Sequence, residues 1–189
     1  SLVGSEMCIR DRFGGVSENL NGFGIPAGCC SDGPSGMRLD CGTKAFSLPN
    51  GTMIASSFNK ELTSELFTFM GLEMAANKVD CLLGPGMNIH RHPLNGRNFE
   101  YFSEDPFLTG KMAAAELKGM AGAGVTGTIK HFCANNRETN RHFIDSVVSE
   151  RALREIYLKG FEIAVKEGGA SSVTVSYTHL RAHETAANL

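Results

Sequence analysis

Four side chains that can form strong hydrogen bonds follow apolar runs of this sequence: Asp32, Arg97, Lys130 and His131. A sugar presents neighbouring hydroxyl groups. Carboxylates can accept hydrogen bonds from these hydroxyls, and cationic or ring nitrogens can donate to them. Hydrogen bonds to charged groups contribute about 1.5–3 kcal/mol each. The residue types therefore predict a site for a compound rich in hydroxyl groups.

Each of these residues also has a purely structural interpretation. Asp32 opens the segment DGPSG, whose residues are typical of a turn that an Asp side chain stabilises. Arg97 could pair with Glu100 or Asp105 and brace its own loop. Lys130 could extend from a strand end into solvent. Residue types alone leave both interpretations open.

The segment LLGPGMNIHRHPLNGRNFEYFSEDP, residues 82–106, runs from a predicted strand through a long polar stretch to the start of a predicted helix. Loops of this length in a compact domain are usually functional or disordered. This one carries Arg, His and Glu side chains that a linker does not need. Its aromatic residues Phe99, Tyr101 and Phe102 are expected to pack against the fold. We expect the segment to form one wall of the site.

Strand-like and helix-like segments alternate along the chain, and they must position these residues. We predict strands over residues 25–30, 79–83, 125–132 and 171–174, and helices over residues 60–77, 106–120 and 150–167. Asn59, Asp105 and Ser149 precede the three helices and are residue types that cap a helix N-terminus. The four-residue spacing of Leu62, Leu66, Met70 and Met74 predicts the core face of the first helix.

This alternation predicts an α/β protein whose parallel sheet is covered by helices. Polar clusters follow the predicted strands, and functional residues at the C-terminal ends of parallel strands suit two architectures. One is a closed eightfold barrel and the other is an open, doubly wound sheet. No G-x-G-x-x-G follows a predicted strand, which disfavours a dinucleotide cofactor. We expect no cofactor.

The composition is that of an ordinary globular protein, with 42% hydrophobic and 20% charged residues and a net charge of −2. This balance gives no reason to expect nucleic acid or an anionic membrane as a partner. No apolar run approaches the roughly 18 residues that span a bilayer. The six cysteines contain no C-x-x-C and are expected to be free thiols. We therefore expect a cytoplasmic rather than a secreted protein.

A rival interpretation starts from His90 and His92, which are one residue apart after a predicted strand. With Lys130 as a bridging ligand they could form the metal site of an amidohydrolase-like barrel. His92 precedes Pro93, however, and the pair lies in an irregular loop where a shared face is not assured. No cluster of Cys or carboxylate ligands accompanies them, so we predict no metal. A non-catalytic sugar-binding role is the other alternative.

The two ends of the chain do not have the character of the rest. Residues 2–12 read LVGSEMCIRDR and residues 175–185 read VSYTHLRAHET. One DNA segment that encodes the first sequence encodes residues 175–184 on its complementary strand. We therefore expect residues 1–12 and 175–189 to be adaptor-like additions, and residues 13–174 to be the natural domain. This expectation leaves no native N-terminus in which to look for a signal peptide.

Four motifs decide between these interpretations: DGPSGMR, the loop segment above, TIKHFCANNRETNR and SERALREIYLKGFEIAVKE. In order and spacing they closely resemble the N-terminal barrel of family 3 glycoside hydrolases, in particular bacterial β-glucosidases. The resemblance covers nearly all of residues 25–173. It implies a partial (β/α)8, TIM-like barrel, truncated before closure. It also implies retaining hydrolysis of a terminal β-glycosyl residue of a small carbohydrate.

The resemblance also implies roles for individual residues. Asp32, Arg97, Lys130 and His131 match positions that hold the non-reducing sugar in that family, and Glu138 is a secondary candidate. Arg137 departs from the family's usual Gln. The family's nucleophile and acid/base correspond to positions beyond the matched segment, so we assign no catalytic residue here. The parent would need its downstream domain, and we expect the isolated chain to be inactive and to fold poorly.

Overall fold

The computed structural model describes residues 22–24, 28–39, 44–177 and 179–183. Its strands are β1 (Cys30–Asp32), β2 (Cys81–Leu83), β3 (Thr126–Phe132), β4 (Asp145–Ser149), β5 (Ser172–Val175) and β6 (His179–His183). Its main helices are α2 (Gly51–Ser56), α3 (Lys60–Ala76), α4 (Pro106–Gly122), α5 (Glu150–Ala152) and α6 (Lys159–Lys166). A π-helical segment, Leu153–Tyr157, joins α5 to α6, and a 3-10 turn, η2, covers Asn98–Glu100.

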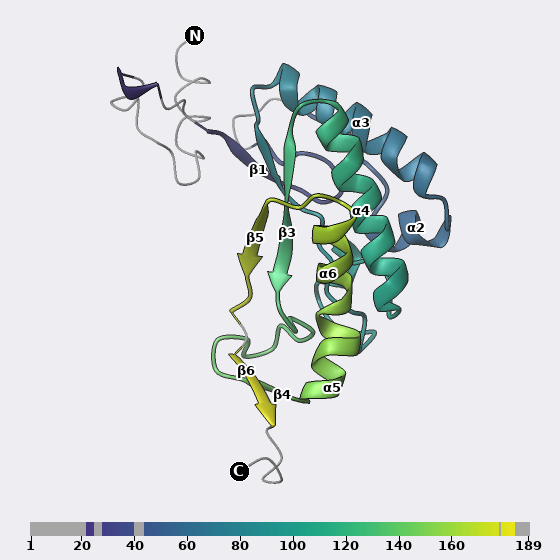
Figure 1. Cartoon of the computed structure of the whole chain (residues 1–189), viewed down its shortest axis with the longest axis vertical. Helices are drawn as coiled ribbons and strands as arrows, with labels where there is room; N and C mark the ends of the chain where they lie inside the picture. The colour runs from purple at the N-terminus through teal and green to yellow at the C-terminus, as the bar shows by residue number, and fades with distance from the viewer. Residues whose placement is uncertain (1–21, 25–27, 40–43, 178, 184–189) are drawn as a thin grey trace.

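Four strands form one parallel sheet in the sequential order β1-β2-β3-β5. Helices α3, α4 and α6 lie together on one side of this sheet (Figure 1). A doubly wound sheet would reverse its strand order and carry helices on both faces. Sequential order with helices on one side is instead the arrangement of a TIM-barrel wall, as predicted. Strands β4 and β6 pair with each other in a separate parallel ladder.

The helices begin where their capping residues predict. The Asn59 side chain accepts a hydrogen bond from the Leu62 N–H at the start of α3. Asp105 accepts from two backbone N–H groups of α4, which has Pro at its first position. Ser149 precedes α5, and its side chain accepts a hydrogen bond from the Ala152 N–H within that helix. Each cap satisfies N–H groups that the first helical turn leaves without partners.

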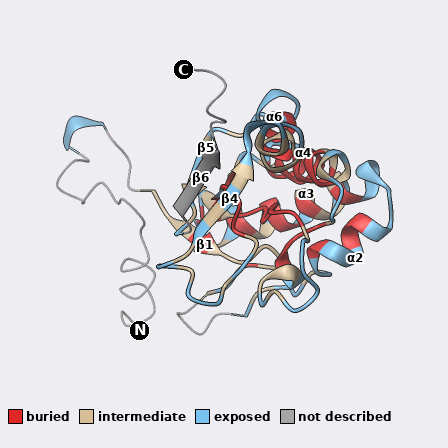
Figure 2. Cartoon of the chain, turned by 90° about the horizontal axis from the view of Figure 1, so that it is seen from below, coloured by how far each residue is buried: buried red, intermediate tan, exposed pale blue. Residues whose placement is uncertain are grey.

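The core lies between the helices and the sheet, where the buried residues gather (Figure 2). Helix α4 is its centre, because α3 packs on one side of it and α6 on the other. A Cβ on Gly119 would lie 2.3 Å from the Ser64 carbonyl oxygen, so only glycine allows α3 to approach α4 this closely. The largest fully buried side chains include Phe67, Met74, Leu82, Met112 and Ile129.

The predicted core face of α3 is wrong in part. Leu62 is 53% exposed, whereas Thr63 and Phe67 are buried together with Met70 and Met74. A strict four-residue spacing rotates about 40° per step around a helix with 3.6 residues per turn. The face that contacts α4 therefore follows mixed three- and four-residue steps, and the predicted stripe turns out of the core at its N-terminal end.

Other elements also differ from the predictions, and β4 and β6 were not predicted. The first strand covers Cys30–Asp32 and so begins at the last residue of the predicted range 25–30, of which residues 25–27 lie outside the described residues. The single helix predicted over residues 150–167 is interrupted by the π-helical segment. Helix α2, which Asn50 caps, was not predicted. A six-residue helix carries too few repeats for its periodicity to be recognised.

Cys29, Cys30, Cys81 and Cys133 form no disulfide in the described part of the chain, as predicted, while Cys8 and Cys41 lie outside the described residues. Burial, with the neighbouring Cys81, raises the pKa of Cys30 to about 12. In the part of the chain that the structure describes, none of the helices has the length and apolarity that crossing a bilayer requires.

Candidate functional site

Three of the predicted residues, Asp32, Lys130 and Arg97, form a chain of ion pairs with Glu100 at the C-terminal edge of the sheet. Lys130, near the end of β3, donates from Nζ to Asp32 Oδ1 at 2.7 Å, and Asp32 is the last residue of β1. The same Nζ lies 3.5 Å from Glu100 Oε2. Arg97 donates from Nε to Glu100 Oε1. Parallel strands and the loop after β2 thus bring distant residues to one place.

Exposure along this chain of charges is uneven. The side chains of Lys130 and Glu100 are each 4% exposed, whereas that of Asp32 is 44% exposed. Arg97 is intermediate at 22%. Lys130 and Glu100 are therefore enclosed by the protein, and the Asp32 carboxylate opens to solvent. A ligand arriving at this edge meets Asp32 and Arg97 first.

The turn after β1 fixes the backbone at Asp32. The Arg38 N–H donates to the Asp32 carbonyl at 2.7 Å, and the Gly36 N–H donates to the Gly33 carbonyl at 3.1 Å. Gly33 has φ +128°, and a Cβ there would lie 1.9 Å from the Gly36 carbonyl oxygen. Glycine is therefore required. The predicted turn chemistry of DGPSG is present, and it coexists with the ion pair of Asp32.

Lys130 and His131 are consecutive, yet both are buried at the site. In a regular strand, neighbouring side chains point to opposite faces. The pairing of β3 with β5 shifts register between Lys130 and Phe132. Such irregularities re-aim side chains next to functional sites. The shift explains how both residues can serve one site.

His131 is held by neutral partners. Its Nδ1 lies 3.3 Å from the Tyr101 hydroxyl oxygen, to which the Asn135 amide donates at 3.1 Å. Its backbone N–H donates to Asn88 Oδ1 at 2.8 Å, and its carbonyl accepts from Asn88 Nδ2. Burial, with the nearby charges of Arg97 and Lys130, lowers the pKa of His131 to about 3. The imidazole is therefore neutral near pH 7.

The charged forms of Asp32 and Arg97 are stabilised at the site. Burial raises the pKa of Asp32, but the hydrogen bond and charge of Lys130 outweigh it, and the net pKa is lowered. Burial likewise lowers the pKa of Arg97, and the hydrogen bond and charge of Glu100 more than restore it. Asp32 is therefore an ionised acceptor and Arg97 a charged donor. Their positions and charge states suit hydrogen bonding to hydroxyl groups.

Glu138, the secondary candidate, lies beside this group. Its Oε1 accepts from Asn135 Nδ2 at 3.0 Å and its Oε2 accepts from Arg141 Nη1 at 2.8 Å. Asn135 also donates to Tyr101, so Glu138 is connected to the partners of His131. Sequence reasoning missed Tyr101, Asn135 and Arg141 as parts of the site. The three-residue spacing from Glu138 to Arg141, the same as that from Arg97 to Glu100, is a signal that could have found the last of these.

The two loop histidines have structural partners. His90 Nε2 lies 3.0 Å from the Asn98 carbonyl oxygen. His92 Nδ1 accepts from the Leu94 N–H at 3.1 Å. Across residues 22–24, 28–39, 44–177 and 179–183, no three His, Cys, Asp or Glu side chains are grouped as metal ligands. The positions of both histidines are explained by the loop hydrogen bonds.

A family model described as "Glycosyl hydrolase family 3 N terminal domain" matches residues 14–188. The chain belongs to this family. Its barrel wall and the order of its motifs are those of a family 3 N-terminal domain. The match extends past residue 174, and the domain boundary at that residue stays a prediction.

Relatives of this family 3 chain are β-glucosidases. A β-glucosidase of Ruminococcus albus is 80% identical over 165 residues, which cover 87% of this chain and 17% of the relative. β-Glucosidase A of Butyrivibrio fibrisolvens is 44% identical over 161 residues, which cover 84% of this chain and 19% of the relative. This chain thus spans less than a fifth of the length of either relative.

Solved structures agree with the fold. A β-glucosidase from Paenibacillus barengoltzii superposes with a TM-score of 0.85 at 58% identity, over 88% of this chain and 18% of that one. β-Glucosidase 3B from Thermotoga neapolitana, solved in complex with glucose, gives a TM-score of 0.82 at 49% identity, over 86% of this chain and 24% of that one. The predicted partial TIM barrel is confirmed, and the amidohydrolase alternative is not favoured.

Proposed function

We propose that this chain supplies the subsite for the terminal β-glucosyl ring in a retaining β-glucosidase-like hydrolase. The observation that carries the proposal is the chain of ion pairs that runs from Asp32 through Lys130 and Glu100 to Arg97, with neutral His131 beside it. These groups come from three segments of the barrel wall that are distant in sequence. The glucose-bound structure of the Thermotoga neapolitana relative supports a small carbohydrate as the ligand.

The charge balance of the site suits an uncharged ligand. Two carboxylates, Asp32 and Glu100, face two cations, Lys130 and Arg97, so the formal charges cancel. Glu138 and Arg141 form a further balanced pair. A site for an anion would carry surplus cations, and a site for a metal would carry surplus carboxylates. A pyranose uses both signs at once, because each hydroxyl can donate and accept.

The described site holds substrate better than it could catalyse. A glycosidase needs a general acid whose pKa is raised. The pKa of Asp32 is lowered instead, and Glu100 and Glu138 are each paired with an arginine. Asp32 is therefore unsuited to be the general acid. As the family resemblance implies, we assign both the nucleophile and the acid/base to other parts of the parent protein. The parent would hydrolyse terminal β-glucosyl residues, with these residues fixing the ring.

The test neutralises the exposed carboxylate without changing its shape. Asp32→Asn removes a charged acceptor, and we expect glucose affinity to fall about tenfold to a hundredfold. Glu65→Gln, an exposed and equally isosteric change in α3, should leave affinity unchanged. Calorimetric or ligand-observed NMR titration of the chain and both variants provides the measurement. Equal affinities for the chain and Asp32→Asn would refute the proposal.

A further inference from the structure

His131 stands at an irregular point of β3. The register with β5 runs from the pair Lys130–Thr174 directly to the pair Phe132–Val175, so His131 has no register partner in β5. Such an extra residue disrupts the backbone ladder locally. His131 is also buried, so its N–H and C=O groups need partners from the protein.

The side chain of Asn88 bonds to both of these backbone groups. The His131 N–H donates to Asn88 Oδ1 at 2.8 Å, and Asn88 Nδ2 donates to the His131 carbonyl at 2.9 Å. Because an N–H can only donate and a carbonyl can only accept, the two bonds fix the orientation of the amide. Asn88 is 2% exposed, so water cannot readily compete for these bonds. One side chain thus takes the place of a strand partner.

The loop segment before Asn88 is paired with β3 through its backbone. The Lys130 N–H donates to the Pro85 carbonyl at 3.1 Å, and the Met87 N–H donates to the Lys130 carbonyl at 2.8 Å. Backbone pairing therefore reaches Lys130, and the Asn88 side chain extends it by one residue to His131. The two neighbouring residues of the site are held by different means.

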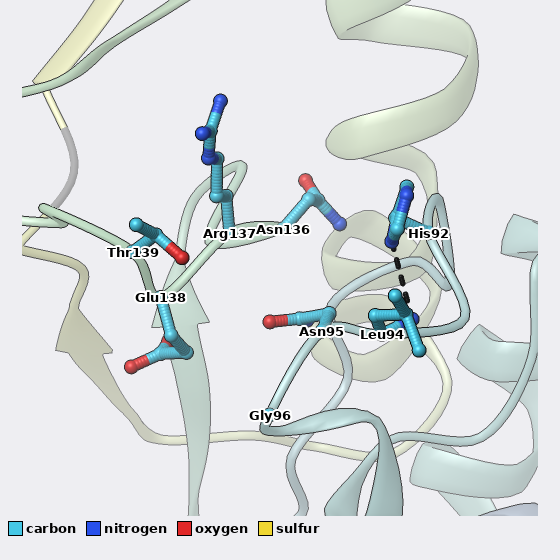
Figure 3. A pocket seen from close by; sticks show the side chains of 8 residues that line it. All are labelled: His92, Leu94, Asn95, Gly96, Asn136, Arg137, Glu138 and Thr139. Atoms are coloured by element: carbon cyan, nitrogen blue, oxygen red, sulfur yellow. Dashed lines mark hydrogen bonds between the residues drawn. The ribbon is translucent and has the colours of Figure 1, made fainter.

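The loop after β3 holds the segment that follows Asn88. Asn136 belongs to that loop, and its Nδ2 donates to the Ile89 carbonyl. Figure 3 shows this side-chain nitrogen turned towards the loop that carries His92. Met87 and Ile89, on either side of Asn88, are both buried. Asn88 is therefore anchored before and after its own position.

We propose that Asn88 is a positioning residue, whose side chain holds the His131 backbone so that the imidazole is correctly placed for the terminal glucosyl ring. The inference rests on the proposed function, because His131 is one of the residues proposed to bind the sugar. Groups that bind a ligand must be held to within about 0.5 Å. A displaced backbone at His131 would move its ring relative to Asp32 and Lys130.

The first experiment measures glucose affinity by ligand-observed NMR titration. We expect Asn88→Ala to weaken binding about fivefold, because the His131 backbone is released. In a His131→Ala background the same substitution should change affinity by less than about twofold, because the ring through which Asn88 acts is absent. Asn77→Ala, which removes a side-chain bond to the backbone at the end of α3, is the matched control and should leave affinity unchanged.

Amide hydrogen exchange separates positioning from general stability. In Asn88→Ala the His131 N–H loses its acceptor, and we expect its exchange to become about tenfold faster. The Lys130 N–H donates to the Pro85 carbonyl and should keep its protection. A substitution that only loosened the fold would accelerate both amides together.

A second variant covers the case in which Asn88→Ala does not fold. Asn88→Asp has nearly the same shape, and its ionised carboxylate keeps an acceptor for the His131 N–H but offers no donor to the carbonyl. We expect its glucose affinity to fall about fivefold while the His131 amide remains protected. Affinity equal to that of the unsubstituted chain would refute the positioning role.

The remaining outcomes separate this role from the proposed function. If glucose binds the chain and Asn88→Ala equally well, the positioning role is refuted and the proposed function stands. Equal acceleration of the His131 and Lys130 amides, or an undiminished effect in the His131→Ala background, would show that Asn88 acts on the fold as a whole and would refute the role. If the chain itself binds no glucose, the proposed function fails and the positioning role fails with it.

Discussion

At the scale of single residues, Lys130 holds the site together. Its ammonium lies between Asp32 and Glu100 and is almost fully buried. Removing one partner of a buried ion pair is far costlier than the pair is worth in net stability. A buried lysine that pairs with two carboxylates therefore fixes the geometry of Asp32, on which the proposed glucose binding depends.

The neutrality of His131 gives a prediction at this scale. Because its pKa is lowered to about 3, its ring should not gain a proton between about pH 8 and about pH 5. A pH titration of the imidazole NMR resonances measures this, with free histidine in the same buffer as the reference. A His131 transition near pH 6.5 would contradict the described burial. Near neutral pH, glucose binding should likewise show no step from this residue.

Residue types singled out side chains that the structure brings together, and the partners of these side chains were harder to predict. Asp32, Lys130 and His131 are recognisable because they stand at or next to predicted strand ends. One interpretation of the sequence paired Arg97 with Glu100 as a structural ion pair, and the structure contains that pair. Tyr101 and Asn135 could not be predicted, because their contacts with the site depend on how the two long loops fold over the sheet. Spacing along the chain carries no such information.

At the scale of elements, α4 combines a predictable start with an unusual interior. Asp105 and Pro106 predicted its first turn correctly. Its buried face includes Glu116, which is 1% exposed and whose Oε2 has no partner among the described residues. Burial raises the pKa of Glu116 well above the ordinary value. Packing on both sides of the helix forces a carboxyl group into the core, which helix periodicity alone would not indicate.

Glu116 therefore predicts a pH dependence of folding. A carboxyl group whose pKa is raised by folding makes its full contribution to the free energy of unfolding at pH values below its unfolded pKa of about 4.5. That contribution is lost as the pH rises from there through the folded pKa. As the pH increases, we expect the free energy of unfolding of Glu116→Gln to rise relative to that of the unsubstituted chain. Chemical denaturation at several pH values measures this, with Glu65→Gln as the exposed control. Parallel pH curves for the chain and Glu116→Gln would contradict it.

At the scale of the whole molecule, the described sheet has two outer strands, β1 and β5. Helix α3 also exposes apolar side chains, with Phe69 at 62% and Leu72 at 54%. Unpaired strand edges and exposed apolar faces favour association with other chains. The chain is thus one wall of a barrel, with surfaces that a complete barrel would cover. The family resemblance predicted this architecture, and helix and strand periodicity alone left a doubly wound sheet open.

This architecture predicts the behaviour of the isolated chain. We expect a broad, poorly cooperative thermal transition with concentration-dependent association, and no turnover of an aryl β-glucoside. Calorimetry, light scattering and a chromogenic assay are the measurements. A sharp melt of a soluble monomer would contradict the account of the exposed surfaces. Enzyme-like turnover would show that the catalytic carboxylates lie within this chain.

The most direct test of the central claim is to map where glucose binds. Titration of isotope-labelled chain with glucose, followed by NMR of side-chain resonances, reports each residue separately. The account predicts saturable shifts at Asp32, Arg97, Lys130 and His131, with Glu65 unchanged. Shifts confined to other surfaces, or no saturable shift at these four residues, would contradict it.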